Sequence, residues 1–179
     1  MNRHYKTLEL DKILKLLAEQ TSIDDAKEMA LSLEPQFELE KVKKLLIQTD
    51  DAVVLSGKYG TPSFGGAKNC ANALRRAEAG GCLSTGELLQ IAETLRIIRS
   101  VKEWHSKFAS TETTLDGYFS GLVSNKFLEE KITNAIISED EISDKASSTL
   151  ADIRRKIRTA SSKAREVLDK IIHSTQYLK

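Results

Sequence analysis

The chain has 179 residues, 40% of them hydrophobic, which is enough to bury a core. Its 27 basic and 26 acidic residues leave a net charge of +1. The chain as a whole is therefore not attracted electrostatically to nucleic acid or to a membrane surface, and any binding charge must be local. Two cysteines are too few for a disulfide scaffold, and no apolar run approaches the roughly 20 residues that cross a bilayer or resembles a signal peptide. We therefore expect a cytoplasmic protein with reduced thiols and no membrane partner.

Apolar residues at helical spacing predict three amphipathic helices in the first third of the chain. The first is centred on residues 10–17. Ser22 is placed to cap the second, which stops before Pro35, and the third covers residues 39–57. The irregular segment 58–66 follows, because it holds three glycines and a proline.

Two further helices are predicted on either side of a glycine pair, in the stretch ALRRAEAGGCLSTGELLQIAETLRIIRSVKEWH, residues 73–105. Gly80 and Gly81 allow the left-handed turn that ends the first of these helices. Ser84 and Glu87 form the pattern of a capping box, which starts the second. The segment is therefore expected to be a helix, a tight turn and another helix.

Shorter helical runs are predicted around residues 115–122 and 128–136. No segment favours a strand, because the one β-leaning triplet, residues 53–55, has helical flanks. We therefore predict an all-α fold, a bundle-like multi-helix core followed by a long C-terminal helix.

The C-terminal segment differs from the rest, since its apolar residues recur in alternating steps of three and four. This period of 3.5 is typical of a coiled-coil seam. With Leu150 at position a, Lys156, Lys163 and Lys170 occupy g positions beside the seam. No stop signal precedes Lys179, so we expect the helix to continue in a longer protein. The seam residues are Leu150, Ile153, Ile157, Ala160, Ala164, Val167 and Ile171.

No motif predicts a catalytic, cofactor-binding or metal site in this chain. Gly57-Lys58 lacks both the earlier glycine and the following serine or threonine of a phosphate-binding loop, because Ala52 and Tyr59 occupy those positions. The three histidines lie far apart in the sequence, and none has a second histidine or a cysteine at helical spacing. An acidic cluster at residues 139–144 lacks the alternating ligands and central glycine of a calcium loop, and we interpret it as a solvated loop.

The C-terminal helix is locally basic, which makes it the one candidate binding site. Between Asp152 and His173 it carries seven basic residues against three acids. Such side chains could contact nucleic-acid phosphates with little dependence on sequence. Alternatively, they flank the seam and pair with acids on another helix. The candidate nucleic-acid contacts are Arg154, Arg155, Lys156, Arg158, Lys163, Arg165 and Lys170.

The order of four landmarks resembles one protein family over roughly residues 5–172. It is similar to the N-terminal region of the bacterial type-two MutS paralogues, the Smr-tailed relatives of mismatch-repair MutS. The landmarks are LELDKILKLLAEQTS, TPSFGG, ALRRAEAGGCLSTGELLQIAETLR and EDEISDKASSTLADIRRKIR.

This resemblance implies a helical core domain over residues 1–145 and, over residues 146–179, the start of a long lever helix that leads toward a clamp. The family's ATPase and Smr nuclease domains, with ATP and Mg, would lie outside this chain, which would itself be no enzyme. The intact protein would be a homodimer that binds branched DNA, suppressing homologous recombination, or binds stalled, collided ribosomes through rRNA and splits them. The alternative interpretation is a free-standing helical module that binds a partner protein through the 3.5-period helix.

Overall fold

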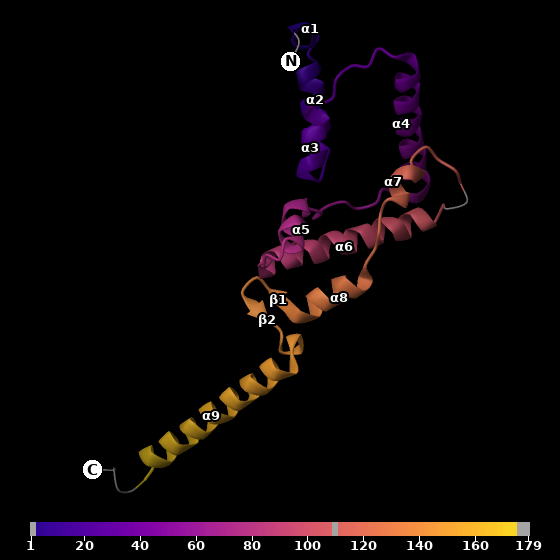
Figure 1. The fold of residues 1–179 in the computed structure, drawn as a ribbon. Coiled ribbons are helices and arrows are strands. Elements are labelled where there is room, and N and C mark those ends of the chain that lie inside the picture. Colours follow the sequence, from indigo (N-terminus) through magenta and orange to yellow (C-terminus); the bar gives the residue numbers. More distant parts are fainter. Residues whose placement is uncertain (1–2, 109–110, 175–179) are drawn as a thin grey trace.

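The computed structural model describes residues 3–108 and 111–174, and Figure 1 shows them as an extended series of helices. The prediction of an essentially helical fold is confirmed, with one small antiparallel hairpin as the exception. None of the described helices combines the length and apolar character needed to span a membrane. In chain order the elements are α1 (Arg3–Thr7), α2 (Leu10–Glu19), α3 (Asp24–Leu31), α4 (Leu39–Tyr59), α5 (Ala71–Glu78), α6 (Thr85–Ser106), α7 (Asp116–Ser120), α8 (Lys126–Ala135), β1 (Ile136–Ser138), β2 (Glu141–Ile142), the 3₁₀ helix η1 (Asp144–Ala146) and α9 (Ser148–Ile172).

Helices α2 and α3 pack against each other at the N-terminal end of the molecule (Figure 1). Their contact buries Leu14, Ala18 and Ala30. The predicted cap at Ser22 is wrong, because α3 begins at Asp24 and no side chain caps it. Its first turn instead carries two aspartates, which the partial positive charge of a helix N-terminus stabilises.

An aromatic cluster fastens the C-terminal end of α4 to α6. Leu55 and Phe108 are 3% and 1% exposed, and Trp104 is buried between them. The Trp104 indole N–H donates a hydrogen bond to the Gly60 carbonyl at 2.8 Å, so its polar atom is satisfied at the end of α4. Trp104 is therefore an anchor of this core cluster.

The turn between α5 and α6 has the predicted construction. Gly80 adopts a φ of 83°, the left-handed region that favours glycine. A β-carbon at Gly81 would lie 2.9 Å from the carbonyl oxygen of Arg76, so the second glycine is needed for space. The Ser84 hydroxyl accepts a hydrogen bond from the Glu87 amide while the Glu87 carboxylate accepts one from the Ser84 amide, which confirms the capping box.

Alanine at either glycine of this turn should destabilise the protein. We expect Gly80→Ala to lower the free energy of unfolding by about 1 kcal/mol because of its left-handed backbone, and Gly81→Ala by about 1 to 3 kcal/mol because backbone atoms must move. Gly57→Ala is the matched control, since Gly57 lies inside α4 with no atom near its would-be β-carbon. Urea denaturation of the three variants measures this, and equal stabilities would contradict the role of the turn.

The second core cluster lies between α6 and α8, beside the hairpin (Figure 1). Ile91, Ala92, Ile132 and Ile136 are its buried members. The prediction that the chain has no strand is wrong here, because β1 and β2 pair with Ile136 opposite Ile142. The predicted helix over 128–136 ends at Ala135, and β-branched isoleucines follow it directly.

Helix α9 projects away from the other helices, at the C-terminal end of the described chain (Figure 1). Ser147 caps it by accepting a hydrogen bond from the Leu150 amide at 3.1 Å. Ser147 lies two residues after the end of the predicted core domain, residues 1–145, and near the start of the predicted lever, residues 146–179. The division of the chain into these two domains remains a prediction.

Candidate nucleic-acid interface

Helix α9 has no buried residue along its 25 residues. The seam residues Ile153, Ile157 and Val167 are 49%, 59% and 54% exposed. Within the described residues the seam therefore has no helical partner, and the coiled coil remains a prediction. Because no side of α9 is buried, exposure does not separate its seven basic residues from one another. Their ion-pair partners do.

Two of the seven basic residues are engaged at the base of the helix. Arg154 donates one hydrogen bond to the Ile142 carbonyl at 2.7 Å and another to the Asp144 carboxylate at 2.6 Å. Arg158 lies 3.5 Å from the other oxygen of Asp144. The hydrogen bond from Arg154 and the charges of both arginines hold the pKa of Asp144 below its usual range. These two arginines therefore have a local structural role that the sequence did not reveal.

Two others pair within α9 itself. Arg155 contacts Asp152 at 2.7 Å, and Lys170 contacts Glu166 at 2.9 Å. Both cations have more than 70% of their side chains exposed. Such pairs contribute little to stability and exchange readily, so these two cations could still turn toward a ligand.

The remaining three, Lys156, Lys163 and Arg165, have no ion pair or side-chain hydrogen bond to any residue that the structure describes. Lys156 and Lys163 are seven residues apart, which places them on one side of the helix at about 10 Å spacing. Arg165 lies about 180° around the helix from Lys156, by the same geometry. The structure thus does not bring all seven predicted residues together.

A shallow groove of about 310 Å³ follows the side that carries the two lysines. We call this side the lysine flank, and define it by the residues that line the groove: Arg155, Lys156, Thr159, Ala160 and Lys163. Three of the five are cationic and one carries a hydroxyl, while none is acidic. This arrangement can donate hydrogen bonds and charge to an anion such as a phosphate, but it has no group suited to acid–base or nucleophilic chemistry at neutral pH.

The described residues include no group of three or more histidine, cysteine or carboxylate side chains able to hold a metal ion. His105 stacks on Phe119, with ring centroids 4.5 Å apart, and its Nε2 lies 3.4 Å from Asp116. Within the acidic cluster, Asp144 pairs with arginines and the Glu139 carbonyl accepts a hydrogen bond from Thr85 at 2.5 Å. Glu139, Asp140 and Glu141 are exposed, in keeping with the predicted solvated loop, whereas the Asp144 side chain is held by the arginines.

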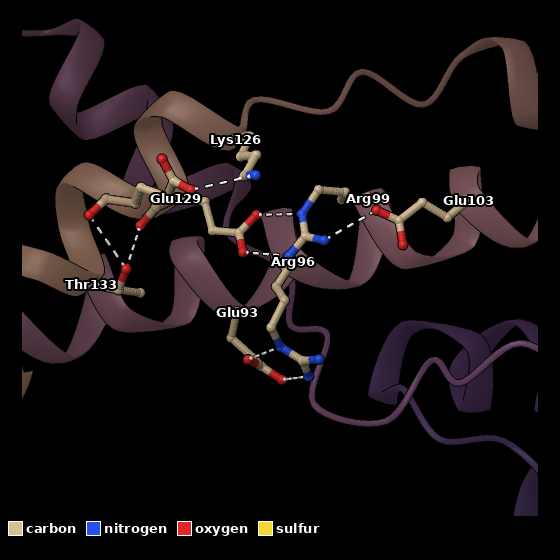
Figure 2. Close-up of polar contacts among 8 residues, drawn as sticks. Glu93, Arg96, Arg99, Glu103, Lys126, Glu129 and Thr133 are labelled. Atoms are coloured by element: carbon tan, nitrogen blue, oxygen red, sulfur yellow. Dashed lines mark hydrogen bonds and ion pairs between the residues drawn. The ribbon is translucent and has the colours of Figure 1, made fainter.

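The most enclosed ion pair joins α6 to α8, and Figure 2 shows it in its network. Arg99 donates two parallel hydrogen bonds to Glu129, at 2.8 and 3.0 Å, and a third to Glu103 at 3.1 Å. The Glu129 side chain is 11% exposed and that of Glu103 is 66% exposed. Arg99 and Glu129 are 30 residues apart in the sequence, so no local pattern could have predicted that they pair.

Replacing Glu129 should make stability less dependent on acid. Arg99 lowers the pKa of Glu129 from its ordinary value of 4.5, so the pair stabilises the fold above that pH and loses its effect as pH falls through the lower folded-state pKa. We expect Glu129→Gln to cost about 1 kcal/mol near pH 7 and almost nothing well below pH 4.5. Thermal melts between about pH 3 and pH 7 measure this difference in stability. Glu103→Gln, at the exposed partner of Arg99, is the control. A cost of Glu129→Gln that does not change with pH would contradict a stabilising charge on Glu129.

Curated relatives resemble this chain over nearly all its length. It is 39% identical over 178 residues to the protein named Endonuclease MutS2 of Acetivibrio thermocellus, covering 97% of this chain and 22% of that protein. It is 38% identical over 177 residues to Endonuclease MutS2 of Ruminiclostridium cellulolyticum, covering 98% of this chain and 22% of that protein. It is 36% identical over 180 residues to Endonuclease MutS2 of Clostridium perfringens strain 13, covering 99% of this chain and 23% of that protein. The chain therefore spans less than a quarter of these relatives. No protein-family model matches it.

Proposed function

Because the chain belongs to the MutS2 family, we propose that it forms the helical core and the start of the lever of a MutS2 protein, and that α9 contacts nucleic-acid phosphates through its lysine flank. Homologues named MutS2 at 36–39% identity over nearly the whole chain support the first part. The second part rests on the unpaired cations of α9.

The single observation that carries the phosphate contact is the state of Lys156 and Lys163. Both are exposed, have no partner among the described residues, and line the same cationic groove. A phosphate backbone supplies negative charges in a row, and it can approach an open helix side without displacing any internal ion pair. Arg154 and Arg158, by contrast, would first have to leave Asp144.

For the intact protein we propose a homodimeric, ATP-driven clamp in which this region links nucleotide state to clamp movement. The relatives are named endonucleases, and this chain covers about 22% of their length. The ATP- and Mg-binding residues and the nuclease residues would then lie in other parts of the protein, and this chain alone would neither hydrolyse ATP nor cut nucleic acid. Its target would be branched DNA, with suppression of homologous recombination, or a collided ribosome, with binding to rRNA and splitting.

A second candidate is a protein-interaction surface, which the exposed seam of α9 favours. A partner helix with the same 3.5-residue period would cover the seam, and its acids would pair with the flanking lysines. The two functions respond to different variants. Ile157→Asn with Val167→Asn should abolish binding of such a helix and, because it adds no charge, spare phosphate binding. Alanine at Lys156 and Lys163 should chiefly weaken phosphate binding.

The direct test is a titration of this chain against fluorescent four-way-junction DNA and, separately, against ribosomes, at low and moderate salt. The proposal predicts binding to at least one target, with an affinity that falls steeply as salt rises. The target bound at moderate salt would identify the natural class. Absence of binding to both targets at low salt would contradict the phosphate contact and leave the seam as the function of α9.

A further inference from the structure

The connection between α9 and the other helices buries no residue of α9 and includes several charged contacts, beside the partly buried Leu150 and Ala151. Helix α9 makes its main contact with η1, and it contributes no buried residue. Two of the contacts are the hydrogen bonds from Arg154 to the Ile142 carbonyl and to Asp144. The third is the longer pair between Arg158 and Asp144. We call this group, Ile142, Asp144, Arg154 and Arg158, the α9 joint.

On its other side the joint is firmly attached to the core. The Ser143 amide donates a hydrogen bond to the Ala135 carbonyl at 2.9 Å, and Ser143 itself is buried. The hairpin is tied to the start of α6 by the Thr85 hydroxyl, which donates to the Glu139 carbonyl. Helix α8 packs on η1. Asp144 and the Ile142 carbonyl thus move with α6 and α8, while both arginines move with α9.

The charged contacts contrast with those that hold the core together. The joint is partly open to water, since the Arg154 and Asp144 side chains are 36% and 43% exposed and that of Arg158 is 65% exposed. The α6–α8 contact, by comparison, combines buried isoleucines with the more enclosed pair between Arg99 and Glu129. No residue of α9 is buried, and only Leu150 and Ala151 at its start are partly buried together with Arg154. Opening the joint would therefore expose little apolar surface compared with opening the α6–α8 contact, so the core can stay folded while the angle of α9 changes.

We propose that the α9 joint is a releasable ion-pair hinge, in which Asp144 fixes the angle of α9 to the core through Arg154 and Arg158. Loss of the Asp144 charge, or of both arginines, frees α9 to swing while α6 and α8 remain packed. The hinge is independent of whether the lysine flank binds nucleic acid, because neither Lys156 nor Lys163 belongs to the joint.

The experiment measures the distance from the core to α9 in the full chain by pulsed electron paramagnetic resonance. A Cys70→Ala, Ser162→Cys protein carries one spin label at the exposed Cys82, beside the start of α6, and one on the polar side of α9. The parent should give one narrow distance distribution. Asp144→Asn, and separately Arg154→Ala with Arg158→Ala, should broaden it at least twofold with unchanged helicity by circular dichroism.

The matched control is Arg155→Ala with Arg165→Ala, which removes two cations of α9 that do not touch the core. Its distribution should remain narrow. Three outcomes would overturn the proposal: a broad distribution in the parent, a narrow one in both joint variants, or a loss of helicity in both joint variants. The last would mean that the contacts are needed for folding and not for the angle alone.

Discussion

Replacing Phe108 with alanine should lower the free energy of unfolding by about 3 to 5 kcal/mol, the largest effect expected for one side chain here. Phe108 is 1% exposed. Its ring lies 4.8 Å from that of Trp104 and 5.1 Å from that of Tyr59, between centroids. Removing it leaves a cavity where α4 meets α6, and an edge-to-face aromatic contact is lost as well.

Chemical denaturation, followed by Trp104 fluorescence and by circular dichroism, measures this effect. Fluorescence should report the loss of the cluster directly, since Trp104 is the only tryptophan. Phe37→Ala is the matched control, because Phe37 is 87% exposed and should change stability by less than about 0.5 kcal/mol. Similar costs at the two positions would show that this cluster does not hold α4.

Removing two lysines from the lysine flank should have the largest effect on binding. We expect Lys156→Ala with Lys163→Ala to weaken binding to nucleic acid about tenfold at low salt. The slope of the logarithm of affinity against the logarithm of salt should fall by about 2, since each phosphate contact contributes about 1. Stability should be unchanged because neither lysine is paired or buried within the described residues.

Fluorescence anisotropy over a range of salt measures both quantities. Lys41→Ala with Lys44→Ala on α4 is the charge-matched control, because it removes the same charge from another exposed helix. The control should keep the parent slope. An equal loss of slope in the two variants would mean that binding follows net charge alone, which contradicts a defined contact surface on α9.

Features set by local sequence could be predicted. The capping box at Ser84 and the left-handed Gly80 depend on residues within one turn of the chain, and both are present. The longer helices were predicted to within a few residues, because their apolar spacing persists over several turns. Even so, the start of α3 was misplaced, since two neighbouring aspartates competed with Ser22 for the helix N-terminus.

Features that depend on distant residues could not be predicted. The β1–β2 hairpin forms beside α6, where Thr85 binds its turn, and five strand residues are too few for a periodic signal. The pair between Arg99 and Glu129 likewise bridges two helices whose register no local pattern reveals.

The candidate site shows the same limit. Seven basic residues on one helix could be read from the sequence, but not which of them form ion pairs. Asp144 was predicted to be part of a solvated loop. It forms ion pairs with Arg154 and Arg158, and these pairs distinguish the two arginines from the other five basic residues. The 3.5-residue period placed Lys156 and Lys163 on one flank correctly, because helical geometry alone fixes that relation.

The most direct measurement of the central claim is a site-specific photocrosslink from α9 in the intact MutS2 protein to its bound nucleic acid. A photoreactive phenylalanine derivative would replace Thr159, which lines the groove of the lysine flank, or Ser161, which lies about 160° farther round the helix. The account predicts crosslinked DNA or rRNA from position 159 and far less from position 161. Crosslinks from position 159 to protein alone, or nucleic acid from position 161 only, would contradict it.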